Sequence, residues 1–519
     1  MRTRKILLLS TLFTTISLFS NAQQKKETAT PKMNIPHDST SGFDYKKPQQ
    51  SVTSGTVSVE GKQIAYKAVA GTLVLKDKMD SPTLCMSYVA YFKEDENDAS
   101  KRPITFIYNG GPGSSTIWLH MGAWGPQRVY INDTSRTRAP YKTVNNDYSL
   151  LDASDLVFID APGTGFGEVL TKQRGGTGDP KDFFGIDQDG ETFASFIKQF
   201  ITEFNRWNSP KFLFGESYGT FRSAVVANIL QAREGIALNG VILLSQLLTY
   251  ENMSDVAKAH PGNDQAYELD LPSFAATAWY HHKLPNQPEK LEPFLKEVEH
   301  FALNDYTLAL KQGSMLDSAS FEHIAGKLHE YIGLPVDYIR KANLRVNGPQ
   351  FEQALLGKES KVTGRLDSRF AGATMDPLSE YAEYDPMDSY IDAAFTATFN
   401  NYVRTQLNFG KELDYKVYGN VYPWNYKRGG DVSFPSVMND LAEAMIYNPD
   451  LKVMLNMGYF DLGTPYFEGI YEMHHLPMPV SLQKNISYAL YYSGHMVYLH
   501  PESLKQLHDN VAKFIESNY

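Results

Sequence analysis

The sequence predicts an α/β protein in which a mostly parallel sheet is interrupted by a mainly helical insertion. Three observations support this fold class. Short, continuous apolar runs recur along the chain, as they do in strands that are buried on both faces of a parallel sheet. Helical patterns lie between several of these runs, and this alternation is typical of α/β proteins. The alternation stops near residue 250 and resumes after residue 430.

The composition is that of a globular protein. The 519 residues are 42% hydrophobic and 21% charged, which excludes a disordered or collagen-like chain. The net charge of −10 argues against a nucleic-acid partner bound through phosphate contacts. The length suits about three domains, or one large domain with an insertion. The single cysteine, Cys85, excludes an intrachain disulfide and a cysteine-based zinc site, and we expect it to be a small buried residue of a strand.

The N-terminal residues 1–22 resemble a signal peptide. Three basic residues precede an apolar run at 6–19, and the small residues at 20–22 offer a cleavage site before Gln23. This run is too short to cross a hydrocarbon core of about 30 Å as a helix; an uncleaved membrane anchor is the alternative. We therefore expect an exported protein, in a bacterial periplasm, with no stable membrane association after cleavage. Residues 23–50 are polar and predict a flexible lead-in.

The first part of the α/β core is predicted over residues 51–250, and the second part over residues 431–519. Runs of β-forming residues at 56–59, 63–66 and 71–75, separated by turn residues, indicate an antiparallel edge. Continuous apolar runs predict the buried parallel strands at 104–108, 156–159, 212–214, 241–244, 453–455 and 486–490.

Residues 251–430 are predicted to form a helical cap that is inserted between the strands at 241–244 and 453–455. Apolar residues between Leu291 and Phe301 share one helical face, and Gly313 follows this run. A second helix is expected around Phe321, with Ser320 as its N-cap.

The sharpest chemical signal is the motif Gly-Glu-Ser-Tyr-Gly at 215–219. It follows the strand at 212–214 and precedes a helical pattern, as a nucleophile elbow requires. A serine at such a sharp turn exposes its hydroxyl, and the flanking glycines let neighbouring backbone approach closely. Ser217 is therefore the candidate nucleophile. The alternative is a glycine-rich turn without chemistry.

A serine hydroxyl needs a base to become a good nucleophile. At a nucleophile elbow, the serine is followed along the chain by an acid and then by a histidine. Asp461 lies just past the strand at 453–455, and His495 lies just past the strand at 486–490. Asp461 could instead be a helix N-cap. The adjacent His474 and His475 point apart and have no Asp or Cys cluster beside them, so we expect a surface loop there rather than a metal site.

A glycine-rich loop, Asn-Gly-Gly-Pro-Gly at 109–113, follows the strand at 104–108. A loop in this position can direct a backbone N–H at an oxyanion. The loop lacks the Gly-Lys-Ser/Thr ending of a phosphate-binding loop. A plain turn is the remaining alternative.

Together these motifs resemble the serine carboxypeptidases, peptidase family S10. Each block alone is weak, but five blocks in the same order are specific to the family. The five blocks are Asn-Gly-Gly-Pro-Gly at 109–113, Asp-Ala-Pro-Gly-Thr-Gly-Phe at 160–166, Gly-Glu-Ser-Tyr-Gly at 215–219, Gly-Tyr-Phe-Asp at 458–461 and Gly-His-Met-Val at 494–497.

The resemblance implies an α/β-hydrolase core with an inserted helical cap, and an enzyme that removes one residue from the free C-terminus of a peptide. It implies Ser217 as the nucleophile, His495 as general base and then acid, and Asp461 as the group that orients His495. The oxyanion hole would be formed by the N–H groups of Gly111 and Tyr218.

The resemblance also implies that Asn109, Gly110 and Glu216 bind the terminal carboxylate of the substrate. Two close carboxylates resist joint ionisation, so one of them would hold a proton, which favours acidic pH. The expected partners are peptides with a free C-terminus, and no cofactor or metal is expected.

The chain departs from the family pattern at several positions. The family usually has a second Glu fourteen residues after the Asn of its loop, where this chain has Ala123. The family's disulfides are absent, Thr464 and Pro465 stand where a Cys-Asn pair often follows the acid, and Gly167 replaces a common Ser. These departures imply a divergent bacterial branch whose carboxylate site is weaker or rebuilt.

Two other functions compete with a serine carboxypeptidase. An acyltransferase or esterase could use the same triad, and the alanine at position 123 motivates this alternative. A catalytically inactive binding protein is the second, and the complete set of Ser217, Asp461 and His495 argues against it.

Overall fold

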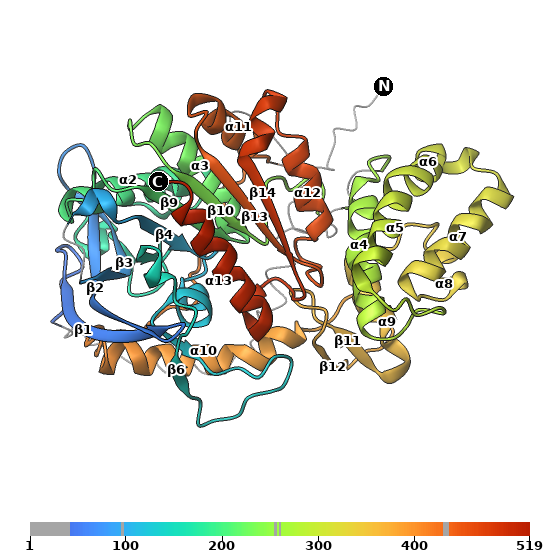
Figure 1. Ribbon diagram of the computed structural model, residues 1–519, viewed down its shortest axis with the longest axis horizontal. Helices are drawn as coiled ribbons and strands as arrows, with labels where there is room; N and C mark the ends of the chain where they lie inside the picture. Colours follow the sequence, from blue (N-terminus) through green and yellow to red (C-terminus); the bar gives the residue numbers. More distant parts are fainter. Residues whose placement is uncertain (1–41, 95–97, 254–256, 259–260, 429–434) are drawn as a thin grey trace, which may run out of the picture.

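The computed structural model describes residues 42–94, 98–253, 257–258, 261–428 and 435–519 (Figure 1). The predicted signal peptide, residues 1–22, lies outside these ranges, as does most of the predicted lead-in. None of the helices within the described ranges is long and apolar enough to span a bilayer.

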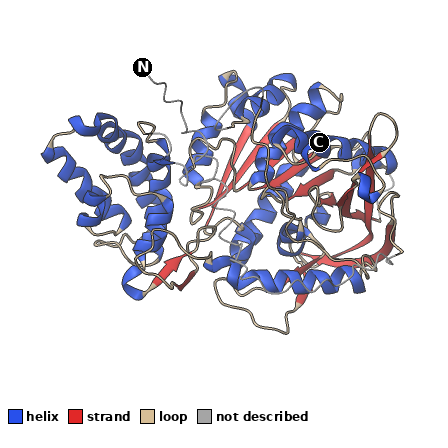
Figure 2. Ribbon diagram, turned by 180° about the vertical axis from the view of Figure 1, so that it is seen from behind, coloured by secondary structure: helices blue, strands red, loops and turns tan. Residues whose placement is uncertain are grey.

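A mixed, mostly parallel sheet forms the centre of the molecule and confirms the α/β fold class (Figures 1 and 2). Within the described residues it has ten strands, of which β8 (Glu168–Val169) pairs only with β3. In spatial order the others are β1 (Gln50–Val59), β2 (Lys62–Lys76), β3 (Pro82–Lys93), β7 (Asp155–Ile159), β4 (Ile104–Tyr108), β9 (Lys211–Glu216), β10 (Gly240–Leu244), β13 (Lys452–Gly458) and β14 (Ile486–Tyr491). The six from β7 to β14 are parallel to one another, and β1 to β3 add an antiparallel edge.

The sheet is covered on both faces by helices. Side chains alternate between the two faces of a strand. In β9, Leu213 therefore enters one hydrophobic core, whereas Phe212 and Phe214 enter the other. The first core includes α2 (Ile186–Glu203), α3 (Tyr218–Ala232), α11 (Met438–Tyr447) and α12 (Tyr466–His474). The second includes α13 (Pro501–Glu516) and the single turn η3 (Leu119–Trp124).

The helices of residues 251–430 divide into two groups. The first group forms a lobe beside the sheet in Figure 1, and its first helix packs against α12. Its helices are α4 (Gln265–Tyr280), α5 (Leu291–Phe301), α6 (Thr307–Gln312), α7 (Ser318–Ile332), α8 (Val336–Lys341) and α9 (Gly348–Leu355). The hairpin β11 (Lys361–Thr363) and β12 (Ala371–Ala373) then leads back from the lobe.

The second group is the single long helix α10 (Pro386–Thr405), which packs on the α/β core rather than in the lobe (Figure 1). Its Phe395 ring lies 5.1 Å from the ring of Trp118, and its Phe399 ring lies 5.4 Å from that of His120. The residues that follow the glycine-rich loop are therefore sandwiched between α10 and the sheet.

Three local expectations were wrong. The strand at 486–490 was predicted to be buried, but β14 is the edge strand of the sheet and its Ser487 and Tyr488 are exposed. The runs at 63–66 and 71–75 belong to one strand, β2, which continues through Gly71 because β1 and β3 pair with it on both sides. The N-cap of α7 is Asp317 and not Ser320, since the Asp317 carboxylate accepts the backbone N–H groups of Ala319 and Ser320. Cys85 is fully buried in β3, as expected.

Candidate active site

The candidate catalytic residues lie at the carboxyl ends of neighbouring parallel strands. Ser217 follows β9, Asp461 follows β13, and His495 follows β14. Asn109 begins the loop after β4, which is the strand next to β9. In open α/β sheets this edge is where ligands bind. The strand order therefore brings together residues that are far apart in the chain.

Ser217 occupies a strained turn between β9 and α3. Its φ of 60° and ψ of −130° lie outside the regions that side-chain-bearing residues normally adopt. The turn is tight enough that a Cβ added to Gly215 would lie 2.2 Å from the carbonyl oxygen of Gly219. A Cβ on Gly219 would lie 2.9 Å from the carbonyl oxygen of Tyr108. Packing therefore requires glycine at both positions. The alternative of a glycine-rich turn without chemistry leaves the backbone strain at Ser217 unexplained.

Asp461 and His495 form a buried pair. His495 Nδ1 lies 2.6 Å from Asp461 Oδ2, and both side chains are almost completely inaccessible to solvent. The other oxygen, Oδ1, accepts the backbone N–H groups of Gly463 and Thr464 at 2.8 and 2.9 Å. Asp461 is not the N-cap of the following helix, because α12 begins after Pro465. The carboxylate is thus fixed by its own turn and is free to orient the imidazole.

Thr464 is a residue of this site that the sequence analysis treated only as a departure. Its hydroxyl donates to Asp461 Oδ2 at 2.7 Å and lies 3.2 Å from His495 Nδ1. The position that often carries a cysteine in the family therefore carries a hydrogen-bond donor to the acid here. In the sequence, only the position of Thr464 three residues after Asp461 could have suggested this hydrogen bond.

The charge of Asp461 favours protonation of His495. Burial alone would lower the pKa of His495, but the attraction and hydrogen bond of Asp461 outweigh burial and raise the pKa. An imidazole with a raised pKa accepts a proton more readily, which suits a general base.

Ser217 and His495 are held at the same sheet edge by backbone contacts. Ser217 donates its N–H to the carbonyl of Leu244, at the end of β10, over 3.0 Å. The next residue, Ser245, donates its hydroxyl to the carbonyl of His495 over 2.6 Å. Among the hydrogen bonds of the described residues, none joins Ser217 Oγ to His495 Nε2; such contacts often tighten only when substrate binds.

A segment of the insertion threads between the loops that carry Asp461 and His495. The carbonyl of Leu366 accepts the N–H of His495 at 2.7 Å, and the carbonyl of Arg365 accepts the N–H of Leu462 at 2.9 Å. Asp367 Oδ2 accepts the N–H of Gly494 at 3.2 Å and is itself paired with Arg369. The residues at 365–369 therefore hold the loops of the candidate residues Asp461 and His495 in place. No local pattern in the sequence indicated this.

The predicted oxyanion-hole residues lie against the elbow. A Cβ added to Gly110 would lie 2.4 Å from the backbone nitrogen of Tyr218, so the glycine-rich loop touches the start of α3. Gly111 is exposed and has a φ of 111°. Within the described residues, neither the N–H of Gly111 nor that of Tyr218 donates to a backbone carbonyl. Both groups are therefore available to a ligand.

Asn109 and Glu216 form a buried polar pair next to Ser217. Asn109 Nδ2 donates to Glu216 Oε1 at 3.0 Å, and each side chain is about 2% exposed. Burial raises the pKa of Glu216 to about 7, although His495, Tyr498 and Asn109 oppose this shift. Glu216 can therefore hold a proton at neutral and acidic pH, as a site for a second carboxylate requires.

A buried ion pair holds the Asn109 loop against α3. Arg222 donates to the carboxylate of Asp189 and, through Nη1, to the carbonyl of Asn109 at 2.7 Å. The guanidinium also lies over the ring of Phe193. The Arg222 guanidinium is held in place by the Asp189 carboxylate and by the Phe193 ring. Its hydrogen bond therefore restricts the movement of the Asn109 backbone.

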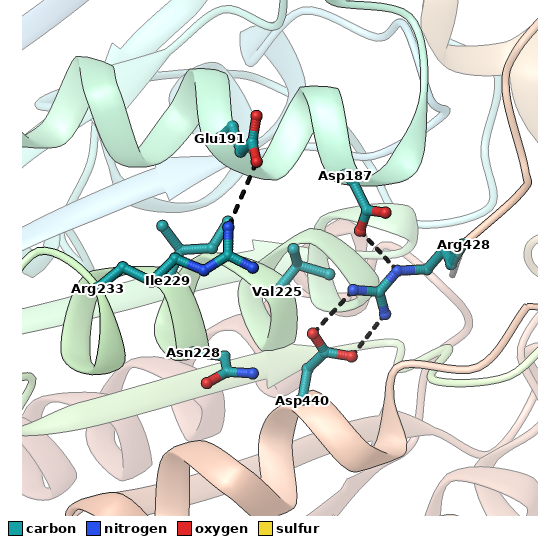
Figure 3. Close-up of a pocket in the computed structure, with 8 residues that line it drawn as sticks. All are labelled: Asp187, Glu191, Val225, Asn228, Ile229, Arg233, Arg428 and Asp440. Carbon is teal, nitrogen blue, oxygen red and sulfur yellow. Dashed lines mark hydrogen bonds and ion pairs between the residues drawn. The ribbon is translucent and has the colours of Figure 1, made fainter. Parts of the chain in front are cut away.

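Two other features do not join the site. His474 and His475 are exposed at the end of α12. A pocket of about 400 Å³ opens between α2, α3 and α11, and none of the predicted catalytic residues lines it (Figure 3). In this pocket Arg428 pairs with Asp187 and Asp440 (Figure 3). The charged side chains that line this pocket are therefore paired with one another.

The comparisons with known proteins agree with the motifs. A family model described as serine carboxypeptidase matches residues 85–483, which include Ser217 and Asp461, whereas His495 lies beyond the match. The pheromone-processing carboxypeptidase KEX1 of Saccharomyces cerevisiae is 29% identical over 144 residues, or 27% of this chain and 19% of that protein. Serine carboxypeptidase-like 20 of Arabidopsis thaliana is 32% identical over 129 residues, or 25% of this chain and 24% of that protein.

These matches span less than a third of either relative. The fold similarity is much longer. The crystal structure of a prohormone-processing carboxypeptidase from Saccharomyces cerevisiae superposes with a TM-score of 0.53 at 16% identity, covering 87% of this chain and 91% of that one. This similarity supports the α/β-hydrolase fold. Since the family model matches well over half of its residues, the chain belongs to the serine carboxypeptidase family.

Proposed function

We propose that the protein is a serine carboxypeptidase that releases the C-terminal residue of a peptide through an acyl-enzyme on Ser217. The observation that carries the proposal is the buried Asn109–Glu216 pair beside the strained Ser217. A triad alone would serve any acyl transfer. A protonatable carboxyl beside the nucleophile adds a partner for the free carboxylate at the end of a peptide chain.

The proposed reaction has two halves, formation of the acyl-enzyme and its hydrolysis, and both use the same side chains. His495 Nε2 takes the proton of Ser217 as Oγ attacks the carbonyl of the last peptide bond. The N–H groups of Gly111 and Tyr218 stabilise the oxyanion. The C–N bond then breaks, and His495 returns the proton to the leaving amine. Water attacks the acyl-enzyme in the second half, His495 takes its proton, and Ser217 regains its hydrogen as the shortened peptide leaves.

The direct test compares two N-blocked dipeptides that differ only at the C-terminus. The free acid should be hydrolysed at least about a hundredfold faster than its amide, because the amide leaves Glu216 and Asn109 without their charged partner. Amino-acid release measured by chromatography checks this ratio. Equal rates for the two would contradict carboxylate recognition and would favour an esterase or acyltransferase with the same triad.

Replacing Glu216 by glutamine should remove a pH dependence of substrate binding. Below pH 7 the wild-type carboxyl is protonated and donates to the substrate carboxylate; above pH 7 it ionises and repels that carboxylate. We therefore expect KM of the wild type to rise about tenfold per pH unit in the alkaline range. Glutamine keeps a neutral donor at all pH values, so KM should stay nearly constant.

The measurement is KM from pH 5 to pH 9 for both proteins. The acid side of the kcat profile, which reflects protonation of His495, serves as the internal control and should persist in the Glu216→Gln variant. An alkaline rise in KM of the same size in both proteins would show that Glu216 does not hold the shared proton.

A further inference from the structure

The phenol of Tyr498 is an unexplained polar group beside the Asn109–Glu216 pair. Tyr498 lies in the short turn η12 (Val497–Leu499), just after His495, and is 4% exposed. Its hydroxyl oxygen is buried and makes no hydrogen bond of normal geometry with the described residues, and the same holds for Glu216 Oε2. Folded proteins leave few buried polar atoms without partners. The two groups lie close enough to interact with each other, and neither is committed to a third partner within the described residues.

The three side chains are close enough to influence one another. Burial, and after it the charge on Glu216, raise the pKa of Tyr498 well above its usual value. In turn, Tyr498 and Asn109 both act to lower the pKa of Glu216, against the larger effect of burial. Tyr498 therefore stays neutral at any working pH and keeps one O–H to donate.

The ring of Tyr498 occupies the space beside the position where the family's second acid is missing. A Cβ added to Gly122 would lie 2.5 Å from Cε2 of Tyr498, so the ring rests directly on the backbone of residue 122. The next residue is Ala123, whose methyl group offers no hydrogen bond. A neutral phenol thus stands next to the segment that lacks the carboxyl.

We propose that Tyr498 donates its hydroxyl hydrogen to the terminal carboxylate of the peptide and so completes, with Asn109 and Glu216, the recognition of a free C-terminus. This inference rests on the proposed function and assigns a specificity-determining residue to it. Each carboxylate oxygen can accept two hydrogen bonds. The protonated Glu216, the amide of Asn109 and the phenol of Tyr498 together supply three donors without adding a second negative charge.

The test is the variant Tyr498→Phe, which keeps the ring on Gly122 and removes only a hydroxyl that makes no hydrogen bond of normal geometry with the described residues. Its melting temperature should equal that of the wild type. The value of kcat/KM for the free-acid dipeptide should fall roughly tenfold to a hundredfold, as expected for one lost hydrogen bond to a charged group, and mainly through KM. The rate on the amidated dipeptide should not change.

Tyr491→Phe is the matched control. Tyr491 is also buried, but its hydroxyl donates to Asn456 at 2.8 Å within the protein. Its loss should leave the ratio of free-acid to amide rates unchanged. An unchanged ratio in Tyr498→Phe, or an equal fall on both substrates, would overturn the role of Tyr498. A wild type that does not prefer the free acid would instead overturn the proposed function, and this inference with it.

Discussion

Replacing Ser217 by alanine is expected to lower kcat by about a millionfold, to the level that binding and oxyanion stabilisation supply alone. In the proposed reaction this hydroxyl forms the acyl-enzyme, and the strained backbone at φ 60° would present it to the substrate. Substrate affinity should change little, because the Asn109–Glu216 pair does not contact the serine hydroxyl in any hydrogen bond of the described residues.

Residue release from the free-acid dipeptide measures this loss, and a serine-reactive phosphonate followed by mass spectrometry locates the nucleophile. The wild type should be labelled at Ser217, and the alanine variant should not be labelled. Ser195→Ala provides the control, since this exposed hydroxyl only donates to a carbonyl of its own helix. Turnover retained in Ser217→Ala, with no contaminating peptidase, would end the proposal of an acyl-enzyme on Ser217.

The sequence predicts the framework of the site well because its signals are local. A buried parallel strand needs an uninterrupted apolar run, and β4, β7, β9, β10 and β13 lie where such runs occur. β14 also lies at its predicted place, but it is the edge strand of the sheet and is only partly buried. The residue just past each strand then lies at the sheet's carboxyl edge. This rule places Asn109, Ser217, Asp461 and His495 together before any contact is known.

The parts that could not be predicted depend on contacts between distant segments. The insertion residues 365–369 bind the loops of Asp461 and His495 through main-chain groups, which leave no side-chain pattern in the sequence. The packing of α10 on the core likewise depends on Trp118 and His120, almost 280 residues away from it in the chain. Tyr498 gave no signal because an isolated tyrosine after a histidine motif is indistinguishable from a core residue.

The replacement Asp461→Asn should lower kcat by about 10⁴-fold with little change in KM. The asparagine oxygen would keep the N–H groups of Gly463 and Thr464, which now bind Oδ1. Its NH₂ group would then face His495 Nδ1, where the carboxylate now accepts a hydrogen bond. A donor at this place forces the ring proton onto Nε2, the nitrogen that must accept the proton of Ser217.

The variant Thr464→Val distinguishes this change of tautomer from a mere loss of a hydrogen bond that holds the Asp461 carboxylate in place. Valine removes the 2.7 Å hydrogen bond to Asp461 Oδ2 but leaves the carboxylate and both backbone N–H groups in place. We expect it to cost roughly tenfold in kcat, as one weakened hydrogen bond does. Steady-state kinetics on the free-acid dipeptide compare the two variants, and NMR of the imidazole nitrogens reads the tautomer. If Asp461→Asn cost no more than Thr464→Val, the orientation of His495 would have to come from the backbone contact with Leu366 rather than from the acid.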